Sequence, residues 1–224
     1  FVMFGASVKG IRGADAQVKT IKDVGEYDLW SKIVIRNAQA GELLAFSYQV
    51  GGIVSGSLGV GANKLDTNMR TTGQLVDESM AVYGIAIQIE RETALRFQAG
   101  GATGGYNALP QDFAEIEMTT LFRFMVGGEK PFAEGLVTWF AESGGIWGSM
   151  GAGAGALLTN NVPTYASLRK WEYKLPIGRI ERFWGEFSWP GNATAIGVFP
   201  AATGVAGMVG IIVRLVGVRA RGVS

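Results

Sequence analysis

Hydrophobic and polar residues alternate with a period of two in several segments of the chain, which is typical of half-buried β-strands. A slip of one residue would expose a whole row of apolar side chains, so the alternation also predicts which face each strand buries. The clearest segments are Glu42–Val50, Met80–Glu90, Glu115–Val126 and Arg182–Trp189.

Each of these strands is expected to bury one row of mostly large apolar side chains. The rows are Leu44, Phe46, Tyr48 and Val50; then Tyr83, Ile85, Ile87 and Ile89; then Ile116, Met118, Thr120, Phe122, Phe124 and Val126; and finally Phe183, Phe187 and Trp189. Glu115 and Glu117 are expected on the solvated face of the third strand.

Four further segments look like strands with two partly buried faces: Leu29–Arg36, Gly135–Phe140, Leu168–Leu175 and Val209–Arg219. The total is eight or nine strands, with Leu75–Met80 as a segment that could hold one or two helical turns. Eight antiparallel strands in a chain of this length favour two packed sheets, and a jelly roll is the commonest solution. The sequence therefore predicts an all-β, single jelly-roll domain over residues 1–224, with residues 1–25 as an extended N-terminal arm.

Glycine is abundant, with 34 residues in a chain of 224. The glycines cluster between the apolar segments and show no collagen period. Because each glycine inside a helix costs about 1 kcal/mol relative to alanine, this composition disfavours long helices. It supports strands that are joined by long glycine-rich loops.

The chain contains no histidine and no cysteine. This composition excludes Ser-His-Asp and Cys-His catalysis, Cys/His zinc sites, thiol redox chemistry and disulfides. Carboxylate chemistry would still be possible, and Glu115, Glu117, Glu134 and Glu142 are the candidates. Nothing in their spacing selects a pair of them, so we expect no enzyme activity, no catalytic residues, no metal, no cofactor and no small-molecule substrate.

The net charge of +1 argues against a dedicated nucleic-acid binder. Basic residues do gather near both ends of the chain, where weak contact with phosphates is conceivable. The residues near the N-terminus are Lys9, Arg12, Lys19 and Lys22, and the nearby Asp15 and Asp23 offset part of their charge. Those near the C-terminus are Arg214, Arg219 and Arg221.

Gly151–Ala156 fits a loose dinucleotide-binding pattern, but neither a clean strand before it nor a long helix after it is predicted. We interpret it as a loop between strands. Two uncharged stretches, Ser143–Leu168 and Gly191–Val213, are long enough to span a bilayer but are interrupted by Gly and Pro. We interpret each stretch as a loop followed by a buried strand. Burial against a neighbouring subunit and contact with a membrane surface both remain open for the two stretches.

Three passages together resemble the jelly-roll major capsid proteins of small tailless icosahedral bacteriophages. The first is Asp66–Leu75, with its Thr-Asn-apolar segment and Gly-Gln-Leu turn, leading into Met80–Glu90. The second is Phe122–Gly145. The third contains the Leu-Pro turn of Trp171–Ile180, the aromatic strand Phe183–Trp189 and the closing Gly210–Arg221.

The resemblance implies a structural protein that self-assembles into an icosahedral shell around a genome, and therefore a location in the virion. The implied partners are other copies of the chain and minor capsid proteins. The basic residues near the two termini become candidates for weak contact with the genome or an internal membrane. The family carries no active site that could be transferred to this chain.

Two other functions remain open from the residues alone. A carbohydrate-binding jelly roll would expose Trp and Tyr on one concave face, for which Trp139, Trp147, Trp171, Trp184 and Trp189 are available. A small outer-membrane β-barrel is the other alternative, although its strands should have similar lengths and short turns on one side.

Overall fold

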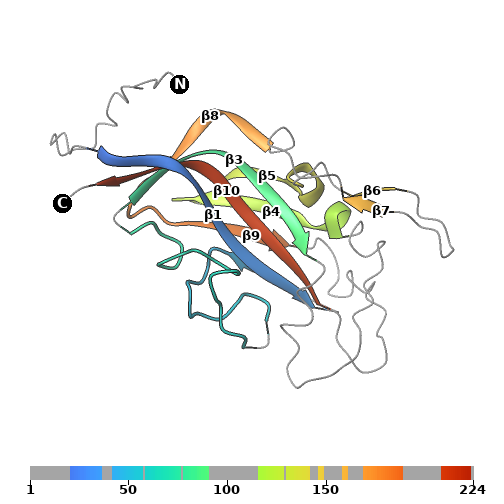
Figure 1. Cartoon of the computed structure of the whole chain (residues 1–224). Coiled ribbons are helices and arrows are strands. Elements are labelled where there is room, and N and C mark those ends of the chain that lie inside the picture. The colour runs from blue at the N-terminus through green and yellow to red at the C-terminus, as the bar shows by residue number, and fades with distance from the viewer. Residues whose placement is uncertain are drawn as a thin grey trace.

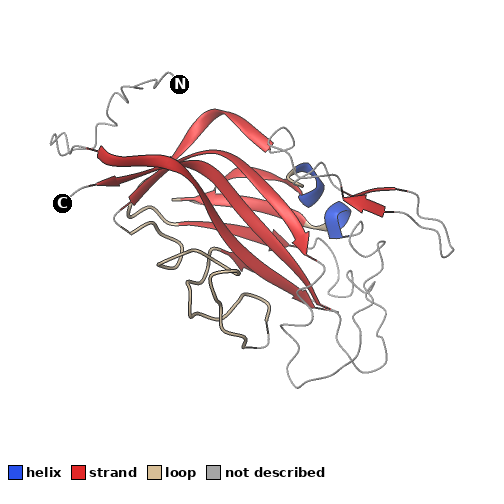
Figure 2. Cartoon of the chain, in the orientation of Figure 1, coloured by secondary structure: helices blue, strands red, loops and turns tan. Residues whose placement is uncertain are grey.

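The computed structural model describes residues 21–36, 42–57, 59–76, 78–90, 116–128, 130–141, 146–148, 158–160, 169–188 and 208–222. These residues are almost entirely β, as predicted (Figure 2). The strands are β1 (Ile21–Arg36), β2 (Leu43–Ala45), β3 (Glu78–Glu90), β4 (Leu121–Val126), β5 (Pro131–Leu136), β6 (Ile146–Gly148), β7 (Leu158–Asn160), β8 (Arg169–Ile177), β9 (Phe183–Ser188) and β10 (Met208–Gly222). A 3-10 helix, η1, spans Val137–Trp139.

Eight of the strands form two four-stranded antiparallel sheets (Figure 1). Sheet A has the order β1-β10-β3-β8, and sheet B has the order β2-β9-β4-β5. The short strands β6 and β7 pair with each other outside the two sheets. Of the predicted N-terminal arm, residues 21–25 belong to β1, and residues 1–20 lie outside the described residues.

The strand pairs are nested along the chain like the two arms of one long hairpin. β1 pairs with β10, β2 with β9, β3 with β8 and β4 with β5, all antiparallel. Successive pairs alternate between sheet A and sheet B. The pairs β10·β3 and β4·β9 then join the two hairpin segments within each sheet.

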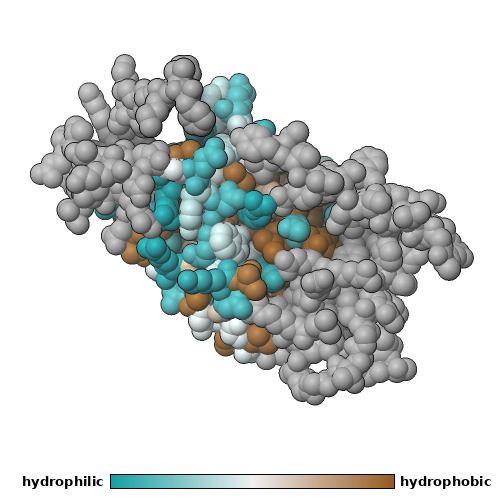
Figure 3. All heavy atoms as spheres, in the orientation of Figure 1, coloured by the Kyte–Doolittle hydropathy of each residue, from teal (hydrophilic) through white to brown (hydrophobic). Residues whose placement is uncertain are grey.

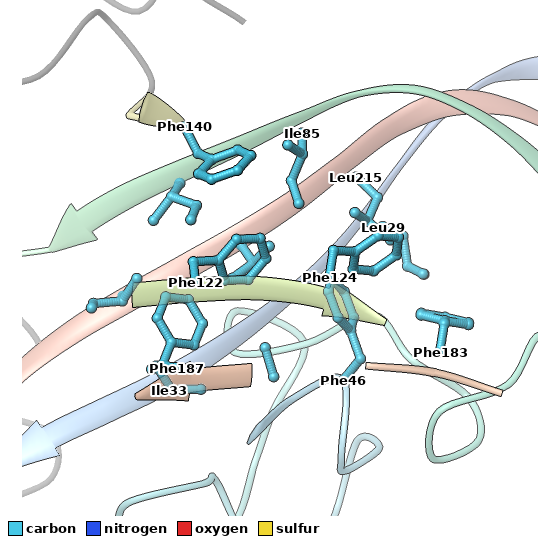
Figure 4. Close-up of a cluster of buried hydrophobic side chains, with 14 of the residues drawn as sticks. Leu29, Ile33, Phe46, Ile85, Phe122, Phe124, Phe140, Phe183, Phe187 and Leu215 are labelled. Carbon is cyan, nitrogen blue, oxygen red and sulfur yellow. The ribbon is translucent and has the colours of Figure 1, made fainter. Parts of the chain in front are cut away.

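The core lies between the two sheets (Figure 4). Sheet B contributes phenylalanines from β4 and β9, and the rings of Phe122 and Phe187 are centred 4.9 Å apart. Sheet A contributes aliphatic side chains from β1, β3 and β10. The fully buried members include Ile33, Ile85, Phe122, Phe124, Phe183, Phe187, Ile211, Val213 and Leu215. The predicted buried faces of β4 and β9 are therefore confirmed at their phenylalanines.

A β-bulge changes the predicted face of β3. The pairing of β3 with β10 shifts between Val82 and Gly84, which leaves Tyr83 as the extra residue. The pairing of β3 with β8 breaks at the same place, where residues 171–174 of β8 have no partner in the register. Before the bulge the core face is formed by Met80 and Val82, and it resumes at Ile85. Tyr83 was predicted on that face, and this prediction was wrong because the alternation restarts after the extra residue.

The first half of the predicted strand Glu115–Val126 is instead a single helical turn at residues 116–119. The amide of Thr120 donates to the carbonyl of Ile116 (3.1 Å), and both residues are buried. Because a helix turns by about 100° per residue, Met118 points outward and is 66% exposed, whereas Glu117 is buried. The prediction that Met118 is a core residue and Glu117 a solvated one was wrong.

The predicted strand Glu42–Val50 is shortened to the three residues of β2, and its register is reversed. Leu43 and Ala45 are buried, and Leu44 is partly exposed. Phe46 then adopts a positive φ of 62°, which ends the strand. Phe46 and Tyr48 are buried as predicted, but they reach the interior from the loop that follows β2.

Three other predicted elements differ from the structure. Gly135 and Leu136 end β5, and the chain then enters η1 instead of continuing as a strand to Phe140. Leu75–Met80 forms no helix, because its last residues belong to β3. β8 is present where expected but is mostly exposed, because it is the edge strand of sheet A. The predicted strands Leu29–Arg36 and Val209–Arg219 are confirmed within β1 and β10.

The loop that follows β2 covers the free edge of β1. The amide of Lys32 donates to the carbonyl of Asp66 (2.8 Å), and the amide of Val34 donates to the carbonyl of Ser55 (2.9 Å). The side chains of Lys32 and Asp66 form a buried ion pair at 3.6 Å. These contacts give β1 hydrogen-bond partners on the side that no strand covers.

Asn68 continues the same edge with its side chain. Its Oδ1 accepts from the amide of Trp30 (2.9 Å), and its Nδ2 donates to the carbonyl of Asp28 (2.8 Å). The side-chain amide therefore forms the two hydrogen bonds that a residue of a neighbouring strand would form with β1. Thr67 adds a hydrogen bond from its hydroxyl to the carbonyl of Trp30 (3.0 Å).

Two isoleucines three residues apart test the position of the core. Ile177 at the end of β8 is 1% exposed, and Ile180 in the next turn is 88% exposed. Ile177→Ala should lower the free energy of unfolding by about 2–5 kcal/mol, because it opens a cavity. Ile180→Ala should change it by no more than about 0.5 kcal/mol. Equal losses in urea denaturation would contradict the core described above.

Two glycines with positive φ test how closely the loop approaches β1. A Cβ on Gly56 (φ 81°) would lie 1.9 Å from the carbonyl oxygen of Val34, whereas a Cβ on Gly59 (φ 83°) would meet nothing within 4 Å. Gly59→Ala should cost about 1–2 kcal/mol from backbone strain alone. Gly56→Ala should cost about 1–3 kcal/mol more through overlap, measured by thermal or urea unfolding. Similar losses would show that the loop does not seal β1.

Candidate functional site

The four candidate carboxylates do not gather into one site among the described residues. Glu117 is buried in the helical turn before β4. Glu134 lies on β5 and forms an ion pair with Arg123. Glu115 and Glu142 lie outside the described residues. The described part of the chain also contains no group of three or more carboxylates that could hold a metal ion.

The outer face of sheet B carries a row of charges across three strands. Arg123 on β4 lies opposite Glu134 on β5 and Glu186 on β9. Its Nε donates to Glu134 (3.1 Å), and its Nη1 donates to Glu186 (3.2 Å). The hydrogen bond to Glu134, reinforced by the charge of that carboxylate, raises the pKa of the Arg123 guanidinium. The row therefore has two negative groups and one positive group.

Two of the basic residues near the C-terminus are part of the folded sheet. Arg214 pairs with Asp28 across β10 and β1. Arg219 pairs with the buried Glu78 (3.2 Å), and its guanidinium lies 4.0 Å from the centre of the Tyr27 ring. These contacts hold strands together, so Arg214 and Arg219 are poor candidates for contact with phosphates. Lys9, Arg12 and Lys19 lie outside the described residues.

Aromatic side chains join the two sheets at the edge formed by β5 and β8. Each of these strands is the last in its sheet. The ring of Trp171 on β8 stacks on Phe124 at 6.4 Å and meets the edge of Phe132 on β5 at 4.8 Å. Phe132 is 44% exposed, and Tyr173, two residues beyond Trp171, is 78% exposed. We call Phe132, Trp171 and Tyr173 the aromatic edge.

Trp139 in η1 adds a further exposed aromatic ring close to β5. A Cβ built on Gly135 would lie 2.2 Å from the Trp139 ring, so the ring packs directly on the backbone of this glycine. The indole is nevertheless 56% exposed. Large exposed aromatic groups held in place by packing are typical of protein interfaces.

The candidate tryptophan platform for sugars is not assembled by the described residues. Trp171 packs against the core between the sheets. Trp184 alternates with the buried Phe183 and Gly185 on β9 and so lies on the outer face of sheet B. Trp189 lies outside the described residues, and the structure describes no side chain for Trp147 in β6.

The outward side of sheet A is mainly hydrophilic, unlike the aromatic edge. Among the coloured residues of Figure 3, hydrophilic ones predominate, and a smaller hydrophobic area lies toward the end of β3. Gly151–Ala156, predicted to be a loop, lies outside the described residues, as do the two uncharged stretches except for β6, β7 and the start of β10. Among the described residues no helix is long and apolar enough to cross a membrane.

Comparison of the chain with known family models, curated proteins and solved structures finds no match.

Sequence reasoning missed both the aromatic edge and the loop that covers β1. The alternation pattern identifies strands but not which of them lie at sheet edges. Pro131 and Pro176 were the available signals, because proline within sheets is largely confined to edges. Asn68 belongs to the Thr-Asn-apolar segment of Asp66–Leu75, but this pattern did not predict the hydrogen bonds that its side chain forms with the β1 backbone.

Two residues of the aromatic edge, Trp171 and Tyr173, differ in burial, and substitutions at both test this difference. Trp171→Ala should lower the free energy of unfolding by about 2–3 kcal/mol, because the half-buried indole packs on Phe124. Tyr173→Ala should leave it unchanged within about 0.5 kcal/mol, because the phenol is mostly exposed. Urea denaturation monitored by circular dichroism measures both. A larger loss for Tyr173→Ala would contradict the inward packing of Trp171.

Proposed function

We propose that this chain is a jelly-roll structural protein that self-assembles into an icosahedral capsid around a genome. The observation that carries the proposal is the nested pairing of β1 with β10, β2 with β9, β3 with β8 and β4 with β5. A jelly roll is an eight-stranded double sheet, obtained when one long antiparallel hairpin is rolled up so that successive pairs alternate between the sheets. The alternation of successive pairs between sheets A and B supports this proposal.

The passages that resemble capsid proteins occupy coherent places in this arrangement, which supports the proposal. Asp66–Leu75 includes the residues that cover the edge of β1 and then leads to β3. Phe122–Gly145 contains most of β4 and all of β5 and η1. The last passage contains most of β8 and β10 and all of β9. The shared features are thus structural ones, as expected if their role is to build a rigid subunit.

The surface also suits a protein that meets many neighbours. Large hydrophobic side chains are exposed on several elements: Leu44, Val50, Ile53, Leu65, Val76, Met118, Phe132, Trp139, Tyr173 and Ile180. Exposed apolar groups mark protein contacts where they gather on a rigid scaffold, and Phe132 beside Trp171 in the aromatic edge is such a place. The proposed partners are other copies of the chain and minor capsid proteins within a virion. Contact with a genome or an internal membrane would fall to basic residues other than Arg214 and Arg219.

Assembly of the purified protein tests the proposal. Negative-stain electron microscopy should show closed particles of regular diameter, or regular capsomers, and sedimentation velocity should show a discrete large species. Each subunit should bury more than about 1,000 Å² against its neighbours, as specific interfaces do. A folded chain that stays monomeric across micromolar concentrations and a range of salt and pH would overturn the proposal.

A further inference from the structure

The turn between β8 and β9, residues Gly178–Arg182, is held rigidly by hydrogen bonds. Within it, the amide of Gly178 donates to the Glu181 carboxylate (3.1 Å), and the amide of Glu181 donates back to the carbonyl of Gly178 (3.3 Å). The carbonyl of Arg182 accepts from Gly127 (2.7 Å), and the carbonyl of Ile180 accepts from the side chain of Gln74 (3.4 Å). The conformation of the turn is therefore set before any partner binds.

This turn displays an apolar side chain between two cations. Ile180 is 88% exposed, the highest value among the large hydrophobic residues that the structure describes. Arg179 and Arg182 are exposed, and neither forms an ion pair within the described part of the chain. Glu181 is turned back onto Gly178, so its carboxylate does not face outward with the arginines. We call Arg179, Ile180 and Arg182 the knob.

The outer face of sheet B has the complementary character. Leu44, Glu186, Arg123 and Glu134 lie opposite one another across the four strands. Leu44 is 37% exposed, and the side chain of Glu134 is 44% exposed. The row carries one more negative than positive charge. Glu42, just before β2, is also exposed.

We infer that the knob of one copy docks on the outer face of sheet B of a second copy. The inference rests on the proposed self-assembly and names the two surfaces that meet. Ile180 would pack beside Leu44, and the arginines would pair with the free carboxylate oxygens of the charged row. Complementary charge fixes the register of such a contact, and a rigid knob loses little entropy on binding.

A contact between two different surfaces of the same chain is head-to-tail, and such contacts close into rings when the rotation between copies allows it.

Two other partners fit the knob less well. Single-stranded nucleic acid is held by cations together with aromatic rings that stack on bases, and the knob contains no such ring. A membrane surface needs a larger apolar face or a second anchor for stable binding.

Cross-linking in the cysteine-free chain tests the contact directly. Ile180→Cys/Leu44→Cys should give a ladder of covalent oligomers in assembled protein treated with a short bismaleimide. Ile180→Cys/Leu65→Cys is the matched control, because Leu65 is 73% exposed but lies in the loop after β2. We expect at least a tenfold weaker ladder from the control, and no dimer from Ile180→Cys alone.

Equal ladders, no ladder, or strong dimers from Ile180→Cys alone would overturn the inference, the last because it indicates a symmetric contact. Charge reversal gives a second measurement. Arg179→Glu should raise the protein concentration needed for assembly at least tenfold. Lys64 is an exposed cation in the loop after β2, and the control variant Lys64→Glu should leave that concentration unchanged. Equal effects would also overturn the inference.

The native chain separates this inference from the proposed function. Native particles that form normally while the knob variants behave like their controls would overturn the knob contact alone. A native chain that never assembles would overturn both. Urea denaturation of Arg179→Glu and Ile180→Cys beside the native chain separates loss of assembly from loss of folding. Variants that unfold like the native chain but fail to assemble support the knob contact.

Discussion

The rest of the structure depends on the packing of the two sheets against each other. Phe122, Phe124, Phe183 and Phe187 enter this layer from sheet B and meet aliphatic side chains from sheet A. Burial of each such side chain contributes about 1.5–3 kcal/mol, and this cluster is the larger of the two groups of buried hydrophobic residues in the described part of the chain. Because the phenylalanines lie on neighbouring strands, they also set the register in which β4 and β9 pair.

The second constraint is the treatment of sheet edges. An uncovered edge strand presents unpaired amides and carbonyls and invites pairing with other chains. β1 is covered by its own loop, through backbone bonds, the Asn68 amide and a buried Lys32–Asp66 pair. β5 and β8 instead carry proline, charged residues and the aromatic edge. The two lateral sides of the sandwich are thus chemically different.

The charged residues fall into two groups with different roles. Arg214 and Arg219 pair with acidic groups of neighbouring strands and tie the sheet together. Arg179 and Arg182 face outward beside an exposed isoleucine. Both groups are arginines in the same third of the chain, and their position in the fold decides which pair with acidic groups and which are exposed to solvent.

Composition and local alternation were enough to predict the all-β class and the aromatic core positions of β4 and β9, and composition excludes histidine and cysteine chemistry. These follow from composition and from a local period of two, which needs no knowledge of distant residues. The tertiary structure alone decided the burial of Glu117, the outward position of Leu44, the bulge at Tyr83 and the roles of the arginines. Each depends on which strands pair and where an element ends. Those outcomes are set by contacts between residues far apart in sequence, such as β1 with β10, and local alternation carries no information about such contacts.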